Sequence, residues 1–341
     1  MRFGHDVGID LGTSNLRIAV RGKGVVLREP SVLAVDRQTG RVLQTGQEAR
    51  KMLGRTPANL CALKPVSGGV IADYDMAVKL LREALRRTLP FSLVKPRLLF
   101  SVPAGITSVE ERAVIQAGLQ AGARRVFLME APLAAAMGAG LPISEPSGSM
   151  VMDIGAGSAD AAILSLGGVC RSLSVPTAGD AMREAIIRYV RRKHGVLIGE
   201  AMAEEAKLRI GCVWEPRAGQ TFEVKGRDLL TGLPRLVELQ ETEMPEALEA
   251  VCDRLMDAVR ELLEQTPPEM VADISRNGVT LTGGGSRLRG LDKRLADYAR
   301  IPVLLADDGE DCVIAGMEQA MQKLDSMQDG ILNLGRRKQL A

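Results

Sequence analysis

Apolar residues along the chain form short continuous runs that alternate with stripes at helical spacing. The runs predict strands at residues 7–11, 16–20, 97–102, 126–129, 149–154 and 279–281, and a hairpin from 222–224 and 236–239. The stripes predict helices at residues 76–88, 109–121, 132–139, 180–194, 203–210 and 245–265, with Ser108 as N-cap of the second. Such alternation is typical of a mixed sheet flanked by helices, so we expect an α/β fold.

One local design occurs twice in the sequence. A strand ending in Asp10-Leu11 leads through residues 12–15 into a second apolar run, and a strand ending in Asp153-Ile154 leads through residues 155–158 into another. Small and polar residues fill both connections, which favours turns. Because the two aspartates lie 143 residues apart in a chain of 341, the pattern predicts an internal duplication of one α/β unit.

Three glycine-rich turns, each after an apolar strand, are candidates for binding a nucleotide. The turns at 12–15 and 155–158 expose backbone N–H groups that can hold phosphate oxygens from opposite sides. Asp10 and Asp153 suit Mg²⁺, which keeps several of its waters. Residues 283–285 are all glycine and precede a predicted helix, so they offer a flat wall for a nucleoside. One such turn also occurs in ordinary hairpins, whereas three turns with paired aspartates predict a nucleotide site.

Composition and charge exclude several other classes. The 44 basic and 42 acidic residues give a net charge of +2, and only one Trp, three Tyr and five Phe are present, so nucleic acid is not expected as a partner. The five scattered cysteines and two histidines lack metal-ligand spacing and suit a reducing compartment. No stretch is apolar enough to span a bilayer, so we expect any membrane contact to be peripheral.

Several stretches together resemble the MreB/Mbl family, the bacterial actin homologues of the actin/Hsp70/sugar-kinase superfamily. The resemblance covers residues 7–325 approximately, and its motifs are specific to MreB-like proteins. The matching stretches are GIDLGT at 8–13, GKGVVLREPSV at 22–32, GRTP at 54–57, GVIAD at 69–73, GAGLP at 138–142, GRDLLTGLP at 226–234 and LTGGG at 281–285.

The resemblance implies an α/β actin-like fold, in which duplicated RNase H-like domains face each other across a nucleotide cleft. It places the first domain at residues 1–145, with a small insertion at about 31–72. The second domain is expected at 146–325, with a small insertion at about 183–244, and residues 326–341 are expected to form a C-terminal tail.

The resemblance also assigns the residues of an ATP site. ATP and Mg²⁺ are the implied cofactors, with the metal held by Asp10 and Asp153 through water, and Ser158 keeps the hydroxyl that the family uses in catalysis. The implied nucleotide contacts are Gly12, Thr13, Ser14, Asn15, Gly155, Ala156, Gly157, Glu204, Glu205, Ala206, Lys207, Gly283, Gly284, Gly285 and Ser286. Glu204 and Lys207 stand three apart on a predicted helix and can face one ligand.

The sequence departs from the family where hydrolysis is expected. MreB-like proteins usually carry Glu-Glu-Pro before the alanine-rich helix, and the second glutamate is credited with orienting the attacking water, whereas this chain has Glu130-Ala131-Pro132. Ala156 also replaces a usual glycine, and residues 158–160 are Ser-Ala-Asp where Thr-Thr-Glu or Thr-Thr-Asp is common. Glu130 is the remaining catalytic candidate, but neighbouring residues at a helix start point in different directions. We therefore expect a slow ATPase at most.

The resemblance implies a membrane-associated actin-like filament that organises peptidoglycan synthesis and maintains rod cell shape. Its implied partners are further copies of the chain in double protofilaments, MreB paralogues in mixed filaments, RodZ and the cell-wall elongation proteins. The implied location is cytoplasmic, peripheral on the inner face of the cell membrane. Leu89, Phe91 and Leu93 belong to an apolar segment with basic residues on both sides, which we expect to dock on anionic lipid.

Two other functions stay open on the fold alone. A small-molecule kinase of the same superfamily needs a general base for the acceptor hydroxyl, and such enzymes usually carry insertions around that pocket, whereas this chain is near the minimal core. A plasmid-partitioning actin shares the fold, although the MreB-specific stretches argue against it. Sedimentation after addition of ATP separates a filament former from a kinase.

Overall fold

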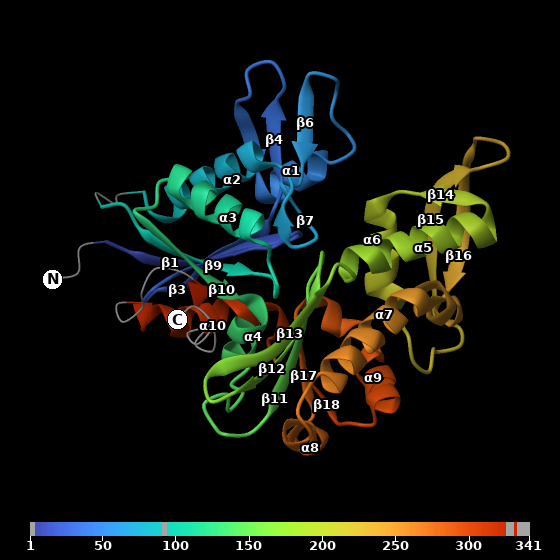
Figure 1. Cartoon of the computed structure of the whole chain (residues 1–341). Helices are drawn as coiled ribbons and strands as arrows, with labels where there is room; N and C mark the ends of the chain where they lie inside the picture. Colours follow the sequence, from blue (N-terminus) through green and yellow to red (C-terminus); the bar gives the residue numbers. More distant parts are fainter. Residues whose placement is uncertain (1–3, 91–93, 325–330, 333–341) are drawn as a thin grey trace.

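The computed structural model describes residues 4–90, 94–324 and 331–332, and two mixed β-sheets form its centre (Figure 1). The first sheet has, in spatial order, the strands β19 (Ile331–Leu332), β10 (Arg125–Glu130), β9 (Arg97–Val102), β1 (Asp6–Leu11), β2 (Asn15–Val20) and β3 (Gly24–Pro30). The second sheet has β13 (Gly168–Val175), β12 (Ala159–Ser165), β11 (Ser149–Ile154), β17 (Val279–Thr282) and β18 (Val303–Leu305).

The two sheets repeat one arrangement, as the internal pattern of the sequence predicts. In each, an antiparallel hairpin, β1–β2 or β11–β12, lies beside a parallel strand, β9 or β17. Helices α2 (Tyr74–Thr88) and α3 (Ser108–Gln120) cover the outer face of the first sheet (Figure 1). Helices α7 (Met244–Glu264), α8 (Pro268–Asn277) and α9 (Leu291–Ala299) cover that of the second. Asp10 and Asp153 therefore lie on equivalent strands.

A pair of helices between the sheets gives both halves a shared core. Helix α4 (Ala131–Gly138) packs on β11 and β12, and α10 (Cys312–Met321) packs beneath β1 and β9 (Figure 1). A side chain on Gly138 or Gly316 would collide with the backbone of the facing helix. Glycine at these two positions therefore allows the close crossing that joins the halves.

Two smaller sheets extend from this centre. The first consists of β4 (Leu33–Asp36), β5 (Val42–Thr45) and β6 (Leu60–Leu63) with helix α1 (Gly46–Met52), next to the short pair β7 (Val66–Ser67) and β8 (Val70–Ile71). The second consists of β14 (Val196–Ile198), β15 (Thr221–Asp228) and β16 (Pro234–Gln240) with helices α5 (Gly179–His194) and α6 (Glu200–Ile210). The domain boundaries stay a prediction.

Two helix starts differ from the sequence prediction. Helix α3 is capped by Thr107, not by Ser108, because the Thr107 hydroxyl accepts from the Glu110 N–H while the Glu110 carboxylate accepts from the Thr107 N–H. The helix expected directly after the three glycines is a short 3-10 helix, η2 (Gly284–Arg287). Helix α9 begins only after Gly290, which has a positive φ of 82°.

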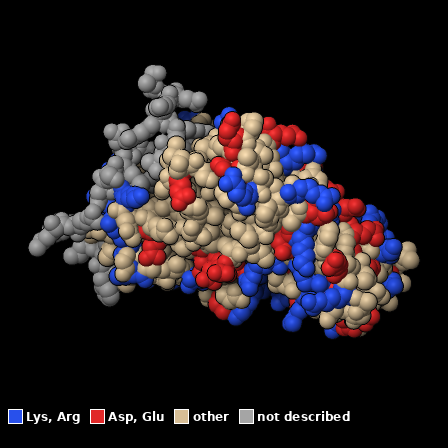
Figure 2. Space-filling model, turned by 90° about the horizontal axis from the view of Figure 1, so that it is seen from below, with Lys and Arg blue, Asp and Glu red and all other residues tan. Residues whose placement is uncertain are grey.

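Charged side chains of both signs share the surface. On the face seen from below, basic and acidic side chains lie next to each other, and a central area is largely uncharged (Figure 2). This mixture agrees with the net charge of +2. Among the residues that the structure describes, no helix combines the length and the apolar character needed to cross a bilayer.

Candidate functional site

Asp10 and Asp153 line one cleft between the two halves, with a volume of about 390 Å³. Ser101 on β9 donates its hydroxyl to Asp10 at 2.8 Å, and Thr282 on β17 donates its hydroxyl to Asp153, also at 2.8 Å. Each donor stands on the parallel strand beside the strand of its aspartate. The duplicated halves therefore orient their carboxylates in the same way.

The base of the cleft is acidic. Burial raises the pKa of Asp153 to about 7, and the charges of Asp160 and Asp10 add to the rise. The hydrogen bond from Thr282 lowers the pKa and only partly offsets this effect. Burial also raises the pKa of Asp10, while Arg17, whose Nη1 lies 3.4 Å from Asp10 Oδ2, opposes that rise. Buried carboxylates whose charges repel each other favour a cation between them.

The two predicted phosphate turns are closed by corresponding backbone hydrogen bonds. The N–H of Gly12 donates to the carbonyl of Asn15 at 3.1 Å, and the N–H of Gly155 donates to the carbonyl of Ser158 at 2.9 Å. These bonds close each turn over the end of its strand and leave the intervening N–H groups to the cleft. The match between the two turns supports their common origin as one duplicated unit.

Helix α5 begins at the second turn. The N–H of Gly179 donates to the carbonyl of Gly155 at 3.1 Å, and the N–H of Asp180 donates to the carbonyl of Ala156 at 2.7 Å. The positive end of the helix dipole therefore lies beside the turn, where it favours a bound anion.

Thr13 of the first turn lies close both to the glycines between β7 and β8 and to Gly157 of the second turn. The N–H of Gly69, between β7 and β8, donates to Thr13 Oγ1 at 3.0 Å. A side chain on Gly157 would collide with the same Thr13 hydroxyl and with Gly68. Glycine at position 157 therefore allows this approach.

The expected nucleoside side of the cleft combines an ion pair with a glycine wall. Lys207 Nζ pairs with Glu204 Oε2 at 2.9 Å and donates to the carbonyl of Gly179 at 3.1 Å. Across from them, a side chain on the first or third glycine of 283–285 would collide with Ile154. The absence of side chains on this wall leaves a flat surface for a ring system.

Three residues that the sequence predicted to contact nucleotide lie outside the cleft. Glu205 is exposed and Ala206 is buried in the core, because their neighbours Glu204 and Lys207 occupy the face of α6 that meets the cleft. Ser286 turns back and donates its hydroxyl to the carbonyl of Gly283 at 2.7 Å. The other predicted contacts, at 12–15, 155–157, 204, 207 and 283–285, line the cleft.

The position of the missing glutamate faces the cleft. Ala131 lines it with a methyl group, whereas Glu130 is buried at the end of β10 and does not line it. Ser158 also lines the cleft, and its Oγ donates to Asp160 Oδ2 at 2.9 Å. Asp160 Oδ1 in turn accepts from the N–H of Ala104 at 2.9 Å. The hydroxyl expected to act in catalysis is therefore held in place, but position 131 offers no carboxylate beside it.

Sequence reasoning missed several residues of this cleft. Ser101 and Arg17 line it, and the buried Thr282 supports Asp153 from outside it. Their roles depend on which strands are adjacent and in which register, and no local pattern reveals that. The start of α5 did carry a usable signal, since two small residues, Ala178 and Gly179, stand at the start of an amphipathic helix.

The oxygen donors of the cleft suit an Mg²⁺ ion that a bound nucleotide helps to hold. Among the described residues, no group of three or more histidine, cysteine or acidic side chains forms a complete metal cage. Mg²⁺ usually binds through one or two carboxylates together with waters and substrate phosphates. Asp10 and Asp153, facing two phosphate turns, fit that mode of binding.

Comparison with known proteins decides the family. The sequence model of the MreB/Mbl proteins matches residues 4–329. The chain belongs to the MreB/Mbl family. It is 46% identical over 329 residues to the cell shape-determining protein MreB of Escherichia coli (strain K12), covering 95% of both chains. It is 44% identical over 326 residues to the cell shape-determining protein Mbl of Bacillus cereus (strain ATCC 10987 / NRS 248), covering 95% of this chain and 98% of that one.

A solved structure of the same family confirms the actin-like fold. The crystal structure of MreB5 of Spiroplasma citri bound to AMPPNP superposes with a TM-score of 0.91 at 34% identity. The match covers 96% of this chain and 98% of that one. The resemblance that the sequence motifs suggested is therefore confirmed for both family and fold.

Proposed function

We propose that the chain binds ATP with Mg²⁺ and assembles into actin-like filaments that maintain rod cell shape and organise cell-wall synthesis. The observation that carries this proposal is the matched pair Asp10 and Asp153 between two phosphate turns that are closed by corresponding backbone hydrogen bonds. Bound between these carboxylates and the phosphates, Mg²⁺ would offset the phosphate charge. The nucleotide in the related Spiroplasma citri structure and the names of the relatives support the same function.

We propose further that ATP hydrolysis is slow. Ala131 faces the cleft where the family carries its water-orienting glutamate, and Glu130 is turned into the protein. Binding depends on the turns and the aspartates, which are present, whereas the rate depends on positioning the attacking water. Filaments of this chain would therefore keep ATP longer than those of a paralogue with the glutamate, and mixed filaments would gain stability.

Docking on the inner face of the cytoplasmic membrane is part of the same proposal. Of the expected apolar residues, Leu89 follows α2 and is partly packed on the core of the first half, whereas Phe91 and Leu93 lie outside the described residues. The basic flank is partly neutralised, since Arg87 pairs with Glu29 at 2.5 Å and Arg86 with Glu83 at 2.9 Å. Lipid binding should therefore depend more on the apolar segment than on its basic flanks. RodZ and the elongation proteins stay expected partners by family.

Sedimentation and electron microscopy of the purified chain test this function. We expect ATP with Mg²⁺ to bring the protein into the pellet as filaments, and anionic vesicles to recruit those filaments. An Asp10→Asn, Asp153→Asn double variant should stay in the supernatant, because both metal carboxylates are lost. A wild-type protein that binds ATP but never sediments would contradict filament formation and would favour a kinase of the superfamily.

A further inference from the structure

Arg17 stands directly beside the proposed metal carboxylate of the first half. Asp10 on β1 and Arg17 on β2 are paired residues of an antiparallel ladder, so their side chains lie on the same face of the sheet. Arg17 Nη1 approaches Asp10 Oδ2 to 3.4 Å, and the Arg17 side chain is only 14% exposed. The equivalent pair of the second half is Asp153 and Asp160, two carboxylates. Of these two equivalent positions, only that of the first half therefore carries a cation.

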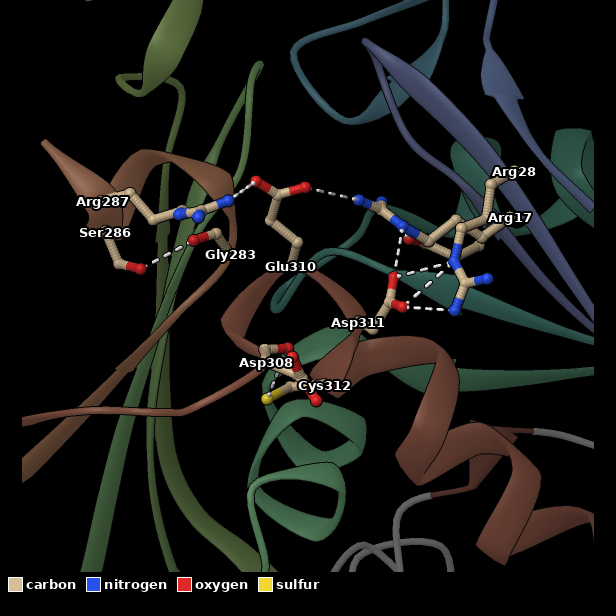
Figure 3. A network of polar contacts seen from close by, with 10 residues as sticks. Arg17, Arg28, Gly283, Ser286, Arg287, Asp308, Glu310, Asp311 and Cys312 are labelled. Carbon is tan, nitrogen blue, oxygen red and sulfur yellow. Dashed lines mark hydrogen bonds and ion pairs between the residues drawn. The ribbon is translucent and has the colours of Figure 1, made fainter. Parts of the chain in front are cut away.

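The same guanidinium also reaches the segment that leaves the second sheet. Arg17 Nε lies 3.1 Å from Asp311 Oδ1, and Arg17 Nη2 lies 3.8 Å from Glu310 Oε2 (Figure 3). Both acids belong to the 3-10 helix η3 (Gly309–Asp311), which connects β18 with α10. Arg17 is thus shared between Asp10 inside the cleft and two acids at the junction of the halves.

Two more arginines complete a network across this junction. Arg28 on β3 pairs with the second oxygen of Asp311 at 2.5 Å, and Arg287 on η2 pairs with Glu310 Oε1 at 2.7 Å (Figure 3). Glu310 therefore lies between an arginine of the first half and an arginine directly after the glycine wall. Asp311 and Arg28 do not line the cleft itself, although they line the groove beside it.

We propose that Arg17 couples the metal site to the junction of the two halves, in that Asp311 and Glu310 draw it away from Asp10 when a cation binds there. This inference rests on the proposed nucleotide site. A divalent cation held by Asp10 would repel the guanidinium of Arg17. The released positive charge then strengthens the pairs with Asp311 and Glu310, which hold the halves together. Because such coupling is reciprocal, an intact junction also favours binding of the cation.

The test measures ATP affinity by calorimetry, once with Mg²⁺ and once in EDTA, for variants at the junction. In Asp311→Asn, Arg17 keeps Asp10 as its main acceptor, so Mg²⁺ must displace it. We expect Mg-ATP to bind about 5-fold more weakly, at the low end of coupling energies because these pairs are partly exposed, and metal-free ATP to bind as in the wild type. Arg28→Gln should not weaken Mg-ATP binding, because Asp311 then keeps Arg17 as its remaining arginine partner.

A matched control and a double variant make the outcome decisive. Asp257→Asn breaks an exposed ion pair with Arg260 on α7, 2.8 Å long and away from the cleft, and should change neither affinity. In an Arg17→Gln background, Asp311→Asn should have no further effect on Mg-ATP. Equal weakening with and without Mg²⁺, or no weakening in either, would overturn the coupling while leaving nucleotide binding intact. A wild-type chain that binds ATP in neither condition would instead contradict the proposed function and this inference with it.

Discussion

Asp10 and Asp153 accept matching hydrogen bonds, each of 2.8 Å to Oδ1, from a hydroxyl on the neighbouring parallel strand. Ser101 supplies the hydroxyl in the first half and Thr282 in the second. A buried carboxylate that is fixed in this way presents its second oxygen to the cleft without loss of orientation. The two halves thus share the hydroxyl groups that orient the aspartates as well as the aspartates themselves.

Replacement of Thr282 by valine should weaken metal-dependent nucleotide binding. Valine keeps the shape of the side chain but removes the hydrogen bond that holds Asp153, and loss of such an orienting contact typically costs about 10-fold in metal affinity. Titration of Mg²⁺ into the protein with ATP present measures the change. Thr280→Val on the same strand is the control, and an equal loss there would show that Thr282 acts only through packing.

The pKa of Asp153, raised to about 7 chiefly by burial, predicts opposite pH effects on stability and on metal binding. The folded metal-free protein takes up a proton as the pH falls through about 7, whereas the unfolded chain does so only near the ordinary value of 3.8. In EDTA the free energy of unfolding should therefore increase as the pH falls from about 8 to about 6. Over the same range Mg²⁺ binding should weaken, because protonated Asp153 is a poor metal ligand. Chemical denaturation of the wild type beside Asp153→Asn checks this, and an unchanged pH slope in the variant would contradict it.

The crossing of α4 and α10 should tolerate no side chain at Gly316. An added methyl group meets the backbone of Ala134, which cannot move without separating the helices that join the two halves. We expect Gly316→Ala to lower the free energy of unfolding by about 2–3 kcal/mol. Gly199→Ala, at the N-cap of α6 where the space is open, should lower it by about 1 kcal/mol or less. Similar melting temperatures for the two variants would argue against a rigid crossing.

Substitutions in the apolar segment should separate lipid binding from assembly. Phe91→Ser with Leu93→Ser should abolish co-sedimentation with anionic liposomes and leave ATP-dependent pelleting unchanged. Leu89→Ser serves as a comparison, because Leu89 packs partly on the core and its loss should lower stability as well. Lipid binding by the double variant at the wild-type level would disprove membrane docking through this segment.

The sequence predicted the elements that carry local signals and missed the contacts that depend on pairing between distant strands. The strands around Asp10 and Asp153, the long helices and the glycine turns follow from apolar spacing and small residues, and the structure has them. The carboxylate contact of Ser101 could not be predicted, because it needs the parallel register of β1 and β9. The family segment at 204–207 places Glu205 and Ala206 at the nucleotide, whereas only Glu204 and Lys207 of this segment lie on the face of α6 that meets the cleft.

Phosphate release during assembly, measured for the wild type beside Ala131→Glu, tests the central claim most directly. The claim predicts that both proteins sediment with Mg-ATP, and that the wild type releases phosphate about 10²-fold more slowly, since a positioned acid–base group typically contributes 10²–10⁴-fold. Equal rates in two proteins that both form filaments would show that the missing carboxylate does not matter. A wild type that neither binds ATP nor sediments would contradict the account as a whole.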